Sequence, residues 1–132
     1  MKSVVFDSYA LLAFLFQEKG HEKVASLMDH ALDLRTEILI ASPNWAEVRY
    51  ILERKLGSAR WRETRAMLLA LPIHIVAADM HLAELAGELK ATRKMSLADC
   101  FAAALAKERK VELFTGDPEL KAVENELKVV WL

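Results

Sequence analysis

Residues 4–16 have the sequence Val4-Val5-Phe6-Asp7-Ser8-Tyr9-Ala10-Leu11-Leu12-Ala13-Phe14-Leu15-Phe16. The short apolar, β-branched run Val4–Phe6 is typical of a buried strand, and Tyr9–Phe16, which is apolar on all sides, is typical of a buried helix. A strand followed at once by a helix is the repeating unit of a parallel sheet covered by helices. The stretch therefore predicts an α/β fold, with an acidic residue, Asp7, at the end of its first strand.

The rest of the chain continues this alternation of strands and helices. Further strands are predicted at Ile38–Ala41, Ile73–Val76, Glu112–Thr115 and Lys128–Trp131, and helices at Glu22–Leu34, from Ser42 to about Leu56, at Ala59–Leu71, at Met80–Arg93 and from Ser96 to about Lys110. Ser42-Pro43 is expected to form an N-cap and a first helical residue, and Gly57 to end that helix. We expect one α/β domain, residues 1–132, built on a parallel sheet of about five strands with helices on both faces.

The composition is that of an ordinary globular domain. Of the 132 residues, 54% are hydrophobic and 28% are charged, so the chain can bury a core without disulfides. The single cysteine, Cys100, lies in an apolar run and is interpreted as a core residue. No apolar run approaches the roughly 20 residues that cross a bilayer, and no signal peptide is evident. A cytoplasmic protein without membrane contact is expected.

Four acidic residues share one edge of the predicted sheet: Asp7, Glu47, Asp99 and Asp117. Asp7 and Asp117 follow the first and fourth strands. Glu47 and Asp99 lie about one turn into helices that begin at the same edge, where α/β sheets bind ligands. Apolar neighbours surround Asp7, Glu47 and Asp99, and no Lys or Arg is adjacent, so a cation is needed to offset their charge. A hard divalent ion with oxygen ligands is the natural partner, and mutual repulsion should raise at least one pKa.

Helix capping is the alternative interpretation of the same acids. Asp7 is placed to cap the helix that follows it, Ser96 and Asp99 fit a capping box, and Asp117 precedes Pro118 as an N-cap would. Capping gives no role to Glu47 and does not explain why all four acids share one edge.

Four segments together resemble the PIN-domain ribonucleases, most closely the VapC-type toxins of toxin–antitoxin pairs. The segments are Val4-Val5-Phe6-Asp7-Ser8, Pro43-Asn44-Trp45-Ala46-Glu47-Val48-Arg49-Tyr50, Ser96-Leu97-Ala98-Asp99-Cys100-Phe101-Ala102-Ala103-Ala104-Leu105-Ala106 and Thr115-Gly116-Asp117-Pro118-Glu119. The resemblance extends over essentially the whole chain. It implies an endoribonuclease dependent on Mg²⁺ or Mn²⁺, with Asp7, Glu47, Asp99 and Asp117 as catalytic and metal-binding acids and Ser8, Asn44 and Thr115 as supporting polar residues. It also implies a cognate antitoxin protein as partner and a homodimer.

One segment of the chain is basic. Residues 48–66 contain six Lys or Arg residues against two Glu, although the whole chain has a net charge of −1. The segment begins directly after Glu47. Its residues Arg49, Arg54 and Arg60 are therefore candidates for contacts with RNA phosphates. A solvated helical hairpin is the alternative.

Two other functions are compatible with these observations. One is a PIN-like RNA-binding or scaffold domain that does not cleave, and the other is a metal-dependent DNA nuclease. The presence of all four acids favours a nuclease over a scaffold, and the sequence does not identify the target RNA.

Overall fold

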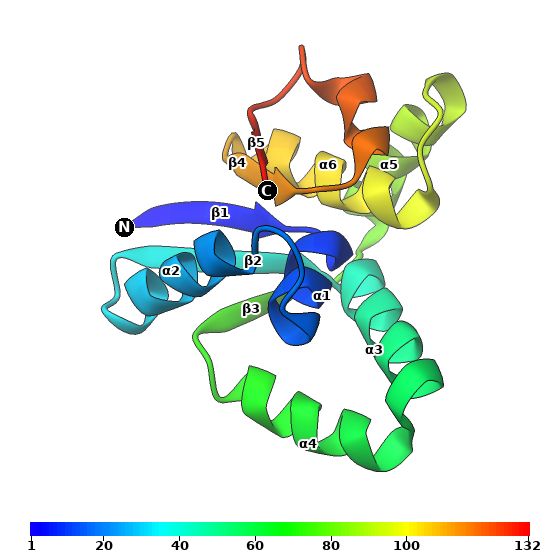
Figure 1. The fold of residues 1–132 in the computed structure, drawn as a ribbon. Helices are drawn as coiled ribbons and strands as arrows, with labels where there is room; N and C mark the ends of the chain where they lie inside the picture. The colour runs from blue at the N-terminus through cyan, green and yellow to red at the C-terminus, as the bar shows by residue number, and fades with distance from the viewer.

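A computed structural model describes all residues from 1 to 132 and contains one five-stranded sheet with six α-helices and a short 3₁₀ helix (Figure 1). In chain order the elements are β1 (Lys2–Phe6), α1 (Ser8–Phe16), α2 (His21–Leu32), β2 (Thr36–Ala41), α3 (Ser42–Leu56), α4 (Ser58–Leu69), β3 (Ile73–Val76), α5 (Met80–Thr92), α6 (Leu97–Arg109), β4 (Glu112–Thr115), η1 (Pro118–Val123) and β5 (Val129–Trp131). All five predicted strands are present, within two residues of their expected ends.

The sheet is parallel throughout and has the strand order β3-β2-β1-β4-β5. The chain adds β2 and β3 on one side of β1, then crosses through α5 and α6 to add β4 on the other side. The direction of winding therefore reverses between β1 and β4, which is where α/β sheets open a crevice for ligands at the carboxyl ends of the strands. The predicted parallel α/β fold is confirmed.

Two hydrophobic cores cover the two faces of the sheet, as the alternation of strand side chains requires. On one face, Val4, Phe6 and Ile38 pack with α1–α4. On the other, Val5 and Leu39 pack with α5, α6 and η1. Figure 1 shows α6 and α5 on one side of the sheet and α1, α2 and α4 on the other. The expectation of helices on both faces is confirmed.

Helices α3 and α4 form a hairpin that extends away from the sheet in Figure 1. Trp61 of α4 is 2% exposed and packs edge-on against Trp45 of α3, with ring centroids 5.4 Å apart. This contact holds the two helices together, so the basic segment 48–66 forms an ordered surface. Trp61 is a core residue here.

Two local predictions are wrong. Ser42 is not an N-cap: α3 starts one residue earlier with Ala41 as its cap, and the Ser42 hydroxyl instead accepts a hydrogen bond from the Ala78 N–H at 3.0 Å. Helix α2 ends at Leu32 rather than Leu34, because Leu34 adopts a left-handed φ of 58° that turns the chain into β2. The 3₁₀ helix η1 follows Asp117, where the sequence offered an N-cap but no helix of stated length.

No helix in the structure is both long enough and apolar enough to span a membrane.

Candidate metal centre

Asp7 joins the first strand to the first helix. It is fully buried, and one of its carboxylate oxygens caps α1 by accepting the Ala10 N–H at 2.9 Å. The other oxygen accepts a short hydrogen bond from the Thr115 hydroxyl at the end of β4. Burial raises the pKa of Asp7 to about 7, the hydrogen bonds from Thr115 and Ala10 oppose that increase, and the charges of Asp117 and Glu47 add to it. Asp7 is therefore a helix cap that also lies among other carboxylates.

Asp99 lies in the first turn of α6, where only 4% of its surface is exposed. Its Oδ2 atom is buried without any hydrogen-bond partner. Burial is the largest cause that raises the pKa of Asp99, to about 9, followed by its contact with the Asp117 carboxyl group and by nearby charges. The expected rise in pKa is thus present, but burial contributes more to it than repulsion does. A buried carboxylate without a partner is costly, so this atom calls for a ligand.

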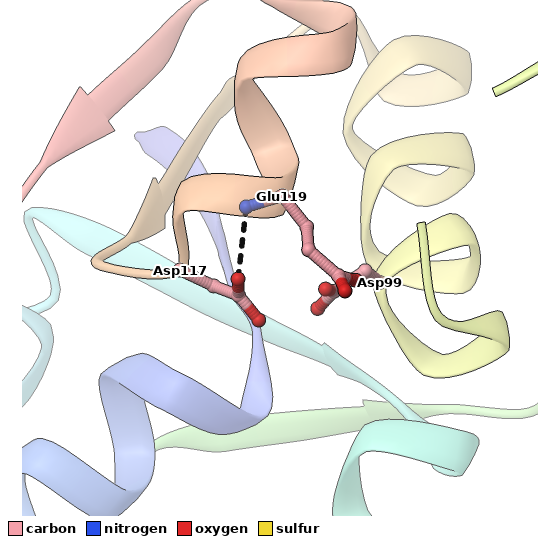
Figure 2. Close-up of side chains that lie close together, drawn as sticks. All are labelled: Asp99, Asp117 and Glu119. Atoms are coloured by element: carbon pink, nitrogen blue, oxygen red, sulfur yellow. Dashed lines mark hydrogen bonds between the residues drawn. The ribbon is translucent and has the colours of Figure 1, made fainter. Parts of the chain in front are cut away.

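Asp117 and Glu119 complete a compact group of carboxylates with Asp99. One ligand oxygen from each residue lies within 4.8 Å of the other two. Figure 2 shows Asp99 on α6 facing the side chain of Glu119, with Asp117 beside them at the start of η1. Asp117 is the N-cap of η1, and its Oδ1 accepts the Glu119 N–H at 2.9 Å. The Asp117 N–H in turn donates to the Thr115 hydroxyl at 2.9 Å, which links this group to Asp7.

Glu47 is held on α3 by polar neighbours. Its carboxylate accepts a short hydrogen bond from the Ser8 hydroxyl and another from the Tyr50 hydroxyl at 3.2 Å. Desolvation and the Glu47 charge raise the pKa of Tyr50, which keeps that hydroxyl a donor. The buried Asn44 side chain donates to the Ser8 hydroxyl and to the Ala98 carbonyl, both at 3.1 Å. These bonds connect α1, α3 and α6 around the carboxylates.

The structure places the four predicted acids at the carboxyl edge of the sheet, but it does not bring them equally close. Asp99 and Asp117 belong to the compact group. The charge of Asp7 acts on Asp99, whereas the charge of Glu47 acts on Asp7. Ser8 donates to Glu47 and Thr115 donates to Asp7, whereas Asn44 acts on the acids only through Ser8. Capping is the correct description of Asp7 and Asp117 as well.

Glu119 is the residue of this site that sequence reasoning missed. Its position two residues after Asp117 was the only available signal, and it depends on η1 turning the side chain back toward α6. The predicted capping box is also half wrong. The Ser96 hydroxyl accepts the Asp99 N–H at 3.2 Å, but the Ser96 N–H donates to Glu119 at 2.7 Å and not to Asp99.

The residues fit a divalent metal ion. None of the site's carboxylates forms an ion pair with Lys, Arg or His, although six other acidic side chains of the chain do. These carboxylates are the four predicted acids and Glu119. The donors are carboxylate oxygens, which hard cations such as Mg²⁺ and Mn²⁺ prefer, and one of them is buried and unpartnered. Asp99 and Asp117 could hold such an ion, with Glu119, Asp7 and Glu47 nearby.

Solved structures of toxin–antitoxin proteins share this fold. VapBC2 from Rickettsia felis, bound to a DNA fragment from its promoter, has a TM-score of 0.74 and 14% identity, covering 98% of both chains. A toxin–antitoxin complex from Klebsiella pneumoniae has a TM-score of 0.68 and 23% identity, covering 96% of this chain and 95% of the other. VapC20 from Mycobacterium tuberculosis, a toxin that cleaves the sarcin–ricin loop, has a TM-score of 0.71 and 16% identity, covering 91% of this chain and 94% of the other.

The search of curated proteins finds no match. A family model described as the PIN domain matches residues 4–126, which include β2, β3, β4, the second half of β1 and all the acids discussed above. The chain therefore belongs to the PIN domain family.

Proposed function

We propose that this PIN domain is a metal-dependent endoribonuclease and the toxin of a toxin–antitoxin pair. The observation that carries the proposal is the buried, unpartnered Oδ2 of Asp99, which lies in a group of carboxylates that no Lys, Arg or His neutralises. Such a site is unfavourable without a cation and favourable with one. The proposed ion is Mg²⁺ or Mn²⁺.

The chemistry of phosphodiester hydrolysis suits these residues. A bound divalent ion lowers the pKa of a water molecule and neutralises charge that develops on the phosphate. Asp99 and Asp117 would hold the ion directly. Asp7, fixed by Thr115 and by the N-terminus of α1, keeps its carboxylate oriented beside them. Glu47, held by Ser8 and Tyr50, would accept a proton from water or join the metal shell.

RNA as substrate and an antitoxin as partner are supported by the similar structures. VapC20 is described as a toxin that cleaves the sarcin–ricin loop, and the Klebsiella pneumoniae structure is a toxin–antitoxin complex. Cleavage in this chain would be tested with matched RNA and DNA oligonucleotides, each with Mn²⁺, with Mg²⁺ and with chelator. We expect cleavage of RNA only, and only with metal. Cleavage of DNA alone would support the rival DNA nuclease, and binding without cleavage would support a scaffold domain.

The antitoxin proposal has its own test. Expression of the chain in a bacterial host should arrest growth, and co-expression of its cognate antitoxin should relieve the arrest and yield a stable complex. Arrest by a folded Asp99→Asn variant would show that growth inhibition does not depend on the proposed site.

The basic hairpin α3–α4 is proposed to track RNA phosphates beside the metal. Arg54 lies 4.9 Å over the ring of Tyr50, whose hydroxyl binds Glu47. Arg49 forms an ion pair with Glu53 at 3.2 Å, and Arg60 forms none.

Single replacements of Arg49, Arg54 and Arg60 by Gln should weaken RNA binding with little change in sequence preference. Each lost phosphate contact should reduce the salt dependence of affinity by about 0.7 in the log–log slope. Arg49→Gln should have the smallest effect, because the ion pair with Glu53 already offsets the charge of Arg49 in the unaltered protein. An unchanged salt dependence of affinity in all three variants would mean that the hairpin is a solvated surface that does not contact RNA.

A homodimer is proposed from the apolar side chains that the fold leaves uncovered. Met80 at the start of α5 is 76% exposed, Leu97 at the start of α6 is 55% exposed, and Tyr9 on α1 is 40% exposed. Light scattering at micromolar concentration should give the mass of two chains, and Met80→Glu combined with Leu97→Glu should give one. A monomer mass for the unaltered protein would contradict this prediction.

A further inference from the structure

The start of helix α6 presents two possible partners for one donor. Ser96 is the N-cap of α6, and its backbone N–H needs an acceptor because the helix offers none. In a capping box the side chain three residues later accepts that N–H, and here that side chain is Asp99. If Asp99 made this bond, one of its oxygens would turn toward its own helix and away from Asp117.

In the structure Glu119 takes that place. Its Oε1 accepts the Ser96 N–H at 2.7 Å, across 23 residues of sequence, so the capping bond comes from η1 and not from within α6. The Ser96 hydroxyl still accepts the Asp99 N–H, so the Asp99 backbone is fixed while its carboxylate is free of the cap. As a result, Oδ2 of Asp99 has no protein partner although it is buried.

Glu119 also orients the second acid of the group. Its backbone N–H donates to Oδ1 of Asp117 at 2.9 Å, the bond drawn in Figure 2. One residue thus fixes the Asp117 carboxylate through its main chain and releases the Asp99 carboxylate through its side chain. Mutation of outer residues that orient metal ligands in this way typically costs roughly 10- to 100-fold in metal affinity.

We propose that Glu119 is a positioning residue, which replaces Asp99 as the capping partner of Ser96 and so leaves the Asp99 carboxylate available to the metal ion. This inference rests on the proposed metal-dependent function. It predicts that the hydrogen-bond acceptor of Glu119 matters more than its charge.

The test is a Mn²⁺ titration of the metal-free protein, followed by the electron paramagnetic resonance signal of free Mn²⁺. Three variants are compared with the unaltered chain: Glu119→Ala, Glu119→Gln and, as a control, Glu18→Ala, whose carboxylate is exposed and unpaired. Glu119→Ala should weaken Mn²⁺ binding by about tenfold, whereas Glu119→Gln, which keeps an oxygen acceptor for Ser96, should stay within about threefold of the unaltered protein. Glu18→Ala should bind Mn²⁺ normally, and thermal melts in chelator check that all variants are folded.

Other outcomes overturn the proposal in different ways. An equal loss in the Gln and Ala variants would mean that the Glu119 carboxylate binds the metal itself. Normal affinity in Glu119→Ala would mean that the bond to Ser96 is only structural. Both results leave the proposed function standing, whereas absence of Mn²⁺ binding in the unaltered protein would overturn the proposed function together with this inference.

Discussion

Asp99→Asn is expected to abolish metal-dependent RNA cleavage while leaving the fold intact. Asp99 is the buried acid whose Oδ2 has no partner in the protein, and the amide that replaces it is a weak metal ligand. Loss of a ligand that contributes several kcal/mol to transition-state stabilisation lowers the rate by at least about a hundredfold. The Ser96 hydroxyl bonds to the backbone N–H of Asp99, so the cap of α6 survives the substitution.

A matched control separates loss of the site from loss of structure. Asp29→Asn makes the same chemical change on the exposed surface of α2, where the carboxylate has no hydrogen bond or ion pair, and it should cleave RNA normally. Thermal melts with Mn²⁺ and with chelator should show that Asp99→Asn unfolds cooperatively but responds less to metal than the unaltered protein. Normal cleavage by folded Asp99→Asn, with a full Mn²⁺ shift, would mean that Asp99 is no ligand.

Most of the fold could be predicted because the strands are short apolar runs separated by helices. Their alternating side chains divide between two cores, with Val4 and Phe6 on one face and Val5 on the other, so the local pattern and the global architecture agree. The errors occur where a tertiary contact overrides a local preference. Ser42 is a residue type that often caps helices, but its hydroxyl accepts the N–H of Ala78, in the segment that follows β3.

The site could be predicted as far as topology determines it. Asp7 and Asp117 follow neighbouring strands, β1 and β4, so the parallel sheet alone brings them to one edge. Glu119 could not be placed, because its role depends on how η1 folds back on the N-terminus of α6. For the same reason the sequence suggested a local capping box for Asp99, whereas the structure satisfies Ser96 from a distant segment.

The free energy of unfolding of the metal-free protein should fall as the pH rises from about 4 to about 9. Burial raises the pKa of Asp7 to about 7 and that of Asp99 to about 9, both from 3.8. Between the ordinary pKa of each acid and its raised pKa, the folded state keeps a proton that the unfolded chain releases. Each rise in pH within this range therefore favours unfolding. Each group contributes up to about 1.4 kcal/mol per pH unit within its own window, and the contribution of Asp7 ends near pH 7.

Ion pairs set the opposite limit at low pH. Lys128 and Lys2 lower the pKa of Glu112, and Arg93 and Lys107 lower the pKa of Glu126. These ion pairs stabilise the folded protein only while the two glutamates are ionised. Their stabilisation is therefore lost as the pH falls below about 4.5. Stability without metal should therefore be greatest in the mildly acidic range.

Melting temperatures at pH 5 and pH 8.5 measure both effects. In chelator the unaltered protein should melt at least about 5 °C lower at pH 8.5, by the usual scaling of roughly 3–5 °C per kcal/mol. Mn²⁺ binds ionised carboxylates, so it should raise the melting temperature far more at pH 8.5 than at pH 5. Asp99→Asn has no proton to lose at this position, so in chelator it should be more stable than the unaltered protein, by a margin that grows with pH. Its Mn²⁺ response should be smaller than that of the unaltered protein. Equal melting temperatures at both pH values in chelator would show that neither acid is held protonated by burial, and the case for a cation at this site would then rest on the unpartnered Asp99 oxygen alone.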